Sequence, residues 1–325
     1  MTAEPRTRTI HVNGIDLSIT EQGSGVPVIL CHGFPGLGYS WRHQIPAIAA
    51  AGWHAVAPDM RGYGHSSRPT DVAAYDRTTT VADIEGLLDA LGADRAIFAG
   101  HDFGAQLTWD LARWIPDRVA GLIQVSVPLT HRAPVSPSTI YTAMARDHFL
   151  HFHYFQEPGV AEQELDNNAA EFLRRIFWAL SDVDRYLTCW EHPSEGNGYL
   201  DVLPPAPPLP WPWLSTDEFD HYVTEFRRTG FTGGLNWYRA ADAVWEQNES
   251  IGDAEIHTPT LFVVGDRDPV LGMMGRDPLG SMKQLVPGLQ CIETVPGAGH
   301  FVQMQEPDQV NAAMVSFLLD LRKEF

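Results

Sequence analysis

Short apolar runs alternate with amphipathic segments along most of the chain. Runs of this kind are typical of strands that are buried on both faces of a parallel sheet. They lie at residues 26–31, 54–57, 96–99, 121–125 and 260–264. Helical patterns are found at residues 41–51, 83–91 and 105–115. Two short strands before the first apolar run form a hairpin pattern at residues 11–20. The alternation predicts an α/β fold with a mostly parallel, doubly wound sheet.

The pattern changes between residues 133 and 245. This stretch is helical in pattern, rich in aromatic residues and histidine, and interrupted by a proline-rich run at residues 204–213. Because the strand series resumes only at residues 260–264, we interpret the stretch as an insertion between two strands of one sheet. The sequence therefore predicts a core formed by residues 1–132 and 246–325, with a helical cap domain at residues 133–245.

Composition and charge exclude several classes of partner. The chain has 325 residues and a formal net charge of −19, which argues against binding to a nucleic-acid backbone. No run approaches the roughly 18 apolar residues of a membrane-spanning helix, and no apolar stretch follows Arg6 and Arg8 as in a signal peptide. The three cysteines share no metal-ligand spacing. We expect a cytoplasmic protein with no metal, cofactor, membrane or nucleic-acid partner, and the sequence leaves open whether it is a homodimer.

The segment Gly-His-Asp-Phe-Gly-Ala at residues 100–105 lies between a predicted strand and a predicted helix. Small residues flanking one reactive side chain are typical of the tight turn that presents a nucleophile above a sheet. The usual residue there is serine, and here it is Asp102. As an alternative, Asp102 could cap the helix, but a cap does not require small residues at Gly100, Gly104 and Ala105. We therefore predict that Asp102 is a nucleophile.

A second segment, His-Gly-Phe-Pro at residues 32–35, directly follows the apolar run at 26–31. In the α/β-hydrolase fold, which the turn at Asp102 indicates, the corresponding loop supplies one backbone N–H of an oxyanion hole. The residue after the nucleophile supplies the other. Phe34 and Phe103 are therefore the predicted donors, and removing one such donor typically costs about 10²–10³ in rate.

A third segment, Gly-Ala-Gly-His at residues 297–300, precedes the last predicted helix. Chain order nucleophile, acid, histidine is typical of this fold, so His300 is the predicted base. The acid should follow the strand at 260–264, where Asp266 and Asp268 are both candidates. We predict that Asp268 orients His300 and that Asp266 shapes the turn.

An aspartate nucleophile restricts the chemistry. Attack by a carboxylate on an ordinary ester would form an anhydride, which is unfavourable, whereas attack on an sp³ carbon bearing a leaving group forms a stable alkyl ester. His300 can then activate the water that hydrolyses this ester. The leaving group can be an epoxide oxygen or a halide.

The chain resembles the soluble epoxide hydrolases of the α/β-hydrolase superfamily. The resemblance covers most of the chain and rests on the segments at 32–35 and 100–105, on FQEPGVAE at 155–162, and on GFTGGLNWYR at 230–239. It implies that two cap tyrosines bind the oxygen of an apolar epoxide. The second tyrosine matches Tyr238.

The position of the first tyrosine is occupied by His151, which departs from the family pattern. Histidine can donate an N–H in either protonation state, so we predict His151 as the partner of Tyr238. Three nearby cap residues are candidates for a further donor or for the pocket wall: Tyr154, Phe152 and Trp237.

Two alternatives remain open from the sequence. Histidine at position 151 also resembles fluoroacetate dehalogenases, although the arginines that such enzymes carry beside the nucleophile are replaced here by Phe103 and Gln106. Haloalkane dehalogenases usually place tryptophan after the nucleophile, where this chain again has Phe103. The other alternative is a small-molecule-binding or signalling protein on the same scaffold. We expect an epoxide hydrolase whose substrates are a small apolar epoxide and water.

Overall fold

A computed structural model of the protein describes residues 4–322 and contains one eight-stranded sheet. The strand order is β1-β2-β4-β3-β5-β6-β7-β8, and pairing is parallel from β4 onward in this order. The strands are β1 (Arg6–Val12), β2 (Ile15–Gly23), β3 (Pro27–Cys31), β4 (His54–Pro58), β5 (Ala96–His101), β6 (Val119–Val125), β7 (Thr260–Gly265) and β8 (Leu289–Val295). The predicted mostly parallel sheet, with an N-terminal hairpin, is confirmed.

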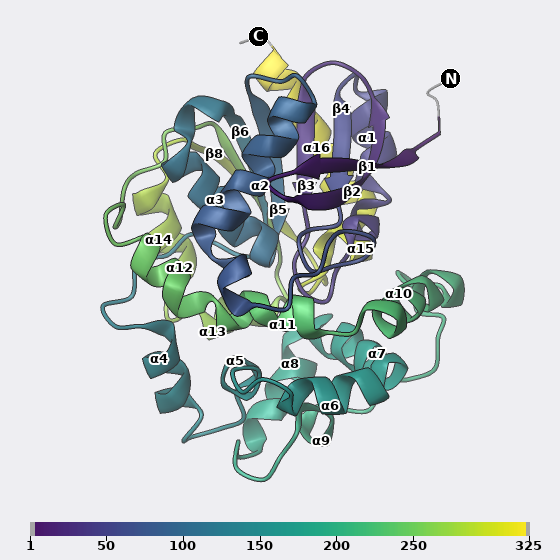
Figure 1. Cartoon of the computed structure of the whole chain (residues 1–325), viewed down its shortest axis with the longest axis vertical. Helices are drawn as coiled ribbons and strands as arrows, with labels where there is room; N and C mark the ends of the chain where they lie inside the picture. Colours follow the sequence, from purple (N-terminus) through teal and green to yellow (C-terminus); the bar gives the residue numbers. More distant parts are fainter. Residues whose placement is uncertain (1–3, 323–325) are drawn as a thin grey trace.

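Helices cover both faces of the sheet. Successive side chains along a strand point to opposite faces, so each strand contributes to two hydrophobic cores. Val28 and Leu30 of β3 pack with α1 (Gln44–Ala50) and α16 (Pro307–Leu321), whereas Ile29 and Cys31 face the core of α2 (Arg77–Ala90) and α3 (Phe103–Trp114). Every β3 side chain is buried. Figure 1 shows α2 and α3 in front of the sheet and α16 behind it.

Three elements differ from the sequence-based expectation. Helix α2 begins at Arg77 because the Asp76 side chain caps it, accepting a hydrogen bond of 2.8 Å from Thr79 N. The helix expected at 41–51 is split into a 3₁₀ turn (Gly38–Trp41) and α1. Strand β8 was missed because it is an edge strand with mostly exposed or half-buried residues, so its sequence contains no apolar run.

Helices α4 to α12 are inserted between β6 and β7, and we call them the inserted helices. They are α4 (Pro137–Met144), α5 (His151–Tyr154), α6 (Val160–Asn167), α7 (Ala169–Leu180), α8 (Val183–Tyr186), α9 (Tyr199–Val202), α10 (Thr216–Thr229), α11 (Thr232–Arg239) and α12 (Ala241–Gln247). In Figure 1 most of them lie below the sheet, at the end away from the termini. The domain boundaries at 133 and 245 remain a prediction.

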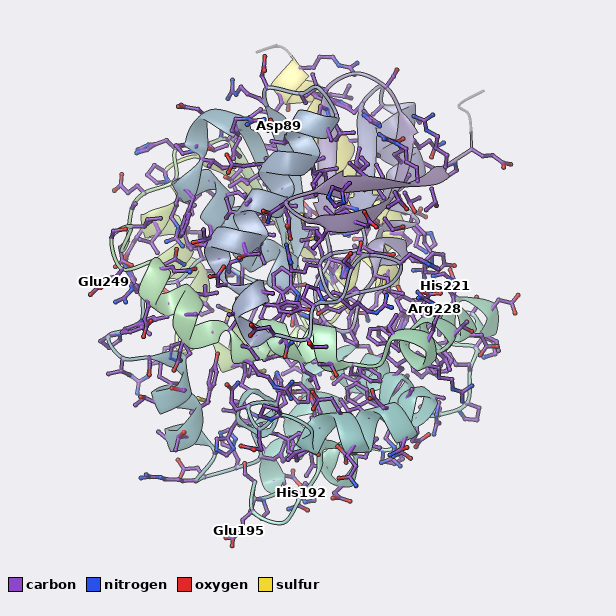
Figure 2. The ribbon with its side chains drawn as sticks, in the orientation of Figure 1. Asp89, His192, Glu195, His221, Arg228 and Glu249 are labelled. Carbon is purple, nitrogen blue, oxygen red and sulfur yellow. The ribbon has the colours of Figure 1, made fainter. Side chains whose placement is uncertain are left out.

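The outside of the molecule carries many charged side chains. Asp89, Glu195 and Glu249 are exposed and point outward in Figure 2. Within residues 4–322, no helix combines the length and the hydropathy needed to cross a bilayer. The expectation about a signal peptide concerns the first ten residues, of which Met1–Ala3 lie outside the described part of the chain.

Candidate active site

The turn between β5 and α3 places Asp102 at the carboxyl end of the sheet. Asp102 has φ 56° and ψ −120°, a strained conformation for a residue with a side chain. A Cβ atom on Gly104 would lie 2.0 Å from the Cys31 carbonyl oxygen, and one on Gly100 would lie 2.3 Å from Thr108 Oγ1. These small residues are therefore required where the helix presses on the sheet, as the sequence predicted.

The Asp102 carboxylate contacts two groups. Its Oδ1 atom accepts a hydrogen bond of 2.8 Å from Phe34 N, and its Oδ2 atom lies 3.6 Å from His300 Nε2. A Cβ atom on Gly33 would be only 2.2 Å from Asp102 Oδ1, so the loop must have glycine there. Burial alone would raise the pKa of Asp102, but the His300 cation and the Phe34 N–H hold it below its usual value. The carboxylate is therefore ionised at neutral pH.

His300 lies between two carboxylates. Its Nδ1 atom is 3.3 Å from Asp268 Oδ2, and Asp268 Oδ1 accepts a hydrogen bond of 2.9 Å from Val270 N, so Asp268 is itself fixed. Burial would lower the pKa of His300, but Asp268 and Asp102 outweigh it and raise this pKa to about 10. The imidazole is thus a cation while Asp102 is ionised. Asp266 accepts a hydrogen bond of 2.7 Å from Gly297 N, which fits its predicted role in the turn.

The loop that carries His300 is held by two neighbours that the sequence did not single out for this task. The His300 carbonyl oxygen lies 2.8 Å from Ser126 Oγ and 2.8 Å from His101 Nε2. Burial lowers the pKa of His101 to about 3, so this imidazole is neutral and can donate through Nε2. Ser126 follows β6 and has φ 70°. Positive φ at serine is a structural signal that no sequence pattern revealed.

The two predicted oxyanion donors are the backbone N–H groups of Phe34 and Phe103. The Phe34 N–H is hydrogen-bonded to the Asp102 carboxylate directly. Phe103 is the first residue of α3, so its N–H is among those that a helix leaves without an intrahelical partner. The arrangement can stabilise an oxyanion that forms at the carboxyl carbon of Asp102.

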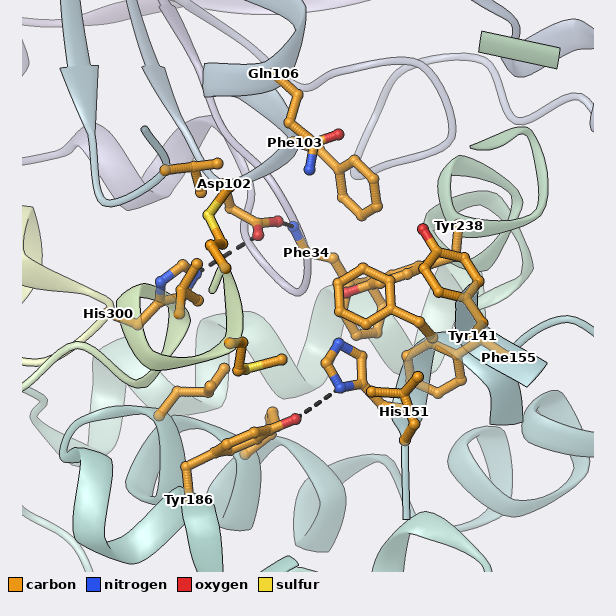
Figure 3. Close-up of a pocket in the computed structure, with 18 of the residues that line it drawn as sticks. Phe34, Asp102, Phe103, Gln106, Tyr141, His151, Phe155, Tyr186, Tyr238 and His300 are labelled. Carbon is orange, nitrogen blue, oxygen red and sulfur yellow. Dashed lines mark hydrogen bonds and ion pairs between the residues drawn. The ribbon is translucent and has the colours of Figure 1, made fainter. Parts of the chain in front are cut away.

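A cavity of about 240 Å³ lies between this end of the sheet and the inserted helices; we call it the catalytic cavity (Figure 3). It is lined by Phe34, Asp102, Phe103, Gln106, Val127, Ile140, Tyr141, Met144, Leu150, His151, Phe152, Phe155, Ile176, Leu180, Tyr186, Tyr199, Tyr238, Val270, Met273, Met274 and His300. Most of these side chains are apolar or aromatic. The cavity therefore suits a largely apolar molecule with one reactive polar group.

Tyr238, from α11, lies in the cavity wall opposite Asp102. Its ring meets Phe103 edge to face at 4.6 Å and Phe34 at 5.5 Å between centroids. Burial raises the pKa of Tyr238 well above its usual value, so the hydroxyl keeps its proton. Within the described part of the chain no hydrogen-bond partner of this hydroxyl is found. It can therefore donate to a ligand oxygen.

His151, at the start of α5, is joined to two tyrosines. Its Nδ1 atom is 2.6 Å from Tyr186 Oη, which is 3.0 Å from Tyr199 Oη. Burial lowers the pKa of His151 to about 3, so the ring is neutral. Figure 3 shows its other nitrogen on the side of Asp102 and Phe34. Tyr186 and Tyr199 were not predicted from the sequence, because a tyrosine that supports another side chain belongs to no recognisable motif.

The structure corrects two of the three further cap candidates. The Tyr154 hydroxyl donates a hydrogen bond of 2.9 Å to Glu164, away from the cavity, because Tyr154 lies on another side of α5. Trp237 Nε1 donates 2.9 Å to the Arg61 carbonyl, and its ring lines a neighbouring cavity instead. Phe152 does line the catalytic cavity.

Comparisons with known proteins place this geometry in context. A family model described as alpha/beta hydrolase fold matches residues 26–174. The chain is 43% identical to Epoxide hydrolase A of Mycobacterium tuberculosis over 98% of both chains, and 37% identical to Epoxide hydrolase 1 of Siraitia grosvenorii over 95% of this chain and 97% of the other. It is similar to the crystal structure of Epoxide Hydrolase A from Mycobacterium thermoresistibile, with TM-score 0.91, 45% identity and coverage of 97% and 98%.

Proposed function

We propose that this chain, which belongs to the epoxide hydrolase family of the α/β-hydrolase superfamily, hydrolyses an epoxide through a covalent ester on Asp102. The proposal rests on how four side chains are arranged around the catalytic cavity. The ionised Asp102 carboxylate stands at a strained turn beside His300, and Tyr238 and His151 line the opposite wall of the same cavity.

In the first step the Asp102 carboxylate attacks an epoxide carbon from the cavity side. A carbon–oxygen bond to Asp102 forms as the epoxide carbon–oxygen bond breaks, and the departing oxygen needs a proton. The Tyr238 hydroxyl and a His151 N–H, from two residues that line the cavity, are the proposed donors. The inserted helices therefore act as a cap that supplies the acid for ring opening.

The tyrosine pair sets which nitrogen of His151 carries its proton. If Tyr199 donates to Tyr186 and Tyr186 donates to His151 Nδ1, the proton of the neutral ring is on Nε2. This nitrogen is the one left free for the substrate. A tyrosine relay thus compensates for the missing tyrosine at position 151.

In the second step water attacks the carbonyl carbon of the ester, and His300 takes a proton from this water. The Phe34 and Phe103 N–H groups stabilise the oxyanion. Its collapse passes the second proton of the water to the departing oxygen, which releases the vicinal diol and the Asp102 carboxylate and leaves His300 as a cation. Esterification removes the negative charge of Asp102, which is one of the two carboxylates that raise the pKa of His300. Alkylation therefore lowers the pKa of His300. The proton of the imidazolium can then return to the donor that protonated the epoxide oxygen, which leaves His300 neutral for its role as base.

The decisive experiment follows the oxygen atom. In a single turnover in H₂¹⁸O with excess enzyme over styrene oxide, the label should enter the Asp102 carboxylate, detected by mass spectrometry of its peptide. The diol should remain unlabelled. A labelled diol with unlabelled Asp102 would mean that water attacks the epoxide directly.

A haloacid dehalogenase is not favoured by the cavity. Among the described residues that line the catalytic cavity there is no arginine or lysine to hold a substrate carboxylate. The apolar lining supports the expectation of an apolar epoxide as substrate. A cytoplasmic location and a homodimer both remain predictions.

A further inference from the structure

A second cavity of about 280 Å³ adjoins the catalytic cavity. Part of the wall belongs to both cavities: Phe103, Gln106, Val127, Tyr141, Phe152, Tyr238 and Met274. The rest of the second cavity comes from the start of α2, the outer half of α3, the segment after β6 and α12. Several aromatic rings line it, among them Trp109, Trp237 and Trp245.

The second cavity differs from the catalytic cavity in charge. Arg77, Arg113 and Arg132 line it, with Asp110 as the acidic side chain in the wall. Arg77 Nε lies 2.6 Å from Asp110 Oδ2, and Arg113 Nη2 is paired with Asp110 Oδ1. Arginine stays protonated in proteins. One carboxylate therefore faces three guanidinium groups, so the wall is cationic in a chain whose formal net charge is −19.

Donor groups of these arginines remain unused. The Nε atoms of Arg113 and Arg132 are buried and have no hydrogen-bond partner. Arg77 is 3% exposed, and its Nε atom lies 2.6 Å from Asp110 Oδ2 as an ion pair without hydrogen-bond geometry. Buried charged donors are costly unless a partner satisfies them.

Arg132 is the arginine with the least compensation. Its guanidinium lies 3.9 Å from the ring centroid of Trp245 and donates a hydrogen bond of 3.1 Å to the Trp245 carbonyl. No carboxylate contacts this guanidinium within the described residues; Asp253 accepts from its backbone N–H instead. The stacking fixes the cation at the cavity wall and leaves its charge for a ligand.

We propose that the second cavity binds an organic acid, with its carboxylate at the three arginines and its apolar body against the aromatic wall. Guanidinium groups match a carboxylate in geometry as well as charge. The shared wall also suggests how the site serves catalysis. It would hold the acidic end of an epoxide substrate whose ring lies at Asp102, or a separate organic acid beside it, and this part of the inference rests on the proposed function.

The binding test uses 4-phenylbutyrate and its neutral amide as probes, with isothermal titration calorimetry on the full chain. The acid should bind at least about 10-fold more tightly than the amide, because charge-assisted hydrogen bonds are lost in the amide. In Arg132→Gln the acid should lose about 10-fold in affinity while the amide is unaffected, and Arg132→Lys should restore part of the loss. Arg118→Gln, which removes an arginine that pairs with Asp89 elsewhere, is the matched control.

Equal affinity for acid and amide, or unchanged acid binding in Arg132→Gln, would overturn the proposal. Circular dichroism should show that Arg132→Gln keeps the wild-type fold, so that a loss of acid binding is not a loss of structure. Because binding needs no turnover, acid binding in a protein that forms no ester on Asp102 would refute the mechanism and leave the second site intact.

A kinetic comparison then identifies the source of the acid. An aryl epoxide that carries a carboxylate on a flexible chain is compared with its methyl ester. A kcat/KM that favours the acid, with the preference lost in Arg132→Gln, supports one substrate spanning both cavities. No preference, with the calorimetric binding retained, supports a separate organic acid in the same site.

Discussion

The two walls of the catalytic cavity are built in different ways. On the sheet side, Asp102, Phe34, Asp268 and His300 lie on loops at the carboxyl ends of strands, and backbone geometry fixes them. On the helical side, the inserted helices carry Tyr238 and the hydrogen-bonded residues His151, Tyr186 and Tyr199. Side-chain contacts hold His151 and the two tyrosines bonded to it in place. In the proposed mechanism, the sheet side contains the groups that make and break the ester, and the helical side contains the groups that recognise the leaving oxygen.

This contrast explains why one fold can support several reactions of an aspartate nucleophile. The ester on Asp102 and its hydrolysis are the same whether an oxygen or a halide has left. Only the helical side must change with the leaving group. Substitutions on the sheet side should therefore stop turnover, whereas those on the helical side should slow one step.

The largest effect is expected for Asp102→Ala. It removes the nucleophile, so kcat for styrene oxide should fall by at least about 10⁴-fold, as for other nucleophile deletions. Diol formation measured by chromatography checks this, and circular dichroism should show an intact fold. Asp89→Ala, at an exposed position, should keep full activity. Substantial residual turnover in Asp102→Ala would refute an aspartate nucleophile.

The next effect is expected for His300→Gln, which separates the two steps. Turnover should fall by about 10³–10⁴-fold because water is no longer activated. Alkylation does not need the base, so one equivalent of ester should accumulate on the Asp102 peptide in rapid-quench mass spectrometry. If the variant is inactive and no ester accumulates, His300 acts before the ester forms, contrary to the proposed order.

The two walls also differ in what the sequence predicts. Asp102, His300 and Asp268 could be predicted because a strained turn and a strand-end loop each need particular residues at particular spacings. A Cβ atom at Gly104 or Gly33 would clash with its neighbours. Tyr186 supports His151 across 35 positions of sequence through one hydroxyl, which leaves no local pattern. Tyr154 was misassigned for a related reason. A short helix gives no reliable register, and the actual register directs Tyr154 toward Glu164.

Strand β8 and the start of α2 show the same limit in the fold. A buried strand is recognisable by its apolar residues, but β8 pairs with β7 at an edge and is mostly polar. The first turn of α2 is set by the Asp76 cap, which apolar periodicity does not report. Sequence patterns thus predict elements whose residues are buried. They miss exposed edge strands and helix ends that depend on a single polar contact.

On the helical side, Tyr238→Phe should have a smaller and more selective effect. Removing one of two donors to the leaving oxygen should slow alkylation by about 10²–10³-fold, by analogy with the loss of one oxyanion donor. The rate of ester hydrolysis should not change, because Tyr238 takes no part in that step. Single-turnover kinetics with styrene oxide measure the two rates. Equal slowing of both steps would contradict the assignment of Tyr238 as a ring-opening donor.

The coupling between Asp102 and His300 predicts an unusual pH dependence. In the free enzyme the pKa of His300 is raised to about 10, so its cation persists through neutral pH and is lost only above that value. The alkylation rate should therefore stay level from pH 7 to 9 and change only above about 10, where Asp102 loses its cationic neighbour. Ester hydrolysis needs neutral His300 and should instead rise with pH, with a lower midpoint. Coinciding midpoints for the two steps would show that esterification does not change the pKa of His300.

The smallest effect is expected for Tyr186→Phe, which removes neither of the proposed donors to the leaving oxygen. Without the hydroxyl 2.6 Å from His151 Nδ1, the ring can place its proton on either nitrogen and loses one hydrogen bond. A hydrogen bond of about 1 kcal/mol corresponds to roughly a 5-fold slower alkylation. Ester hydrolysis should be unaffected in Tyr186→Phe. The substitution His151→Tyr restores the family residue, so that variant should retain ring opening. Tyr154→Phe removes a hydroxyl bound to Glu164 outside the cavity and should leave both rates unchanged. A Tyr186→Phe variant with wild-type alkylation would show that the helical side positions His151 by packing alone.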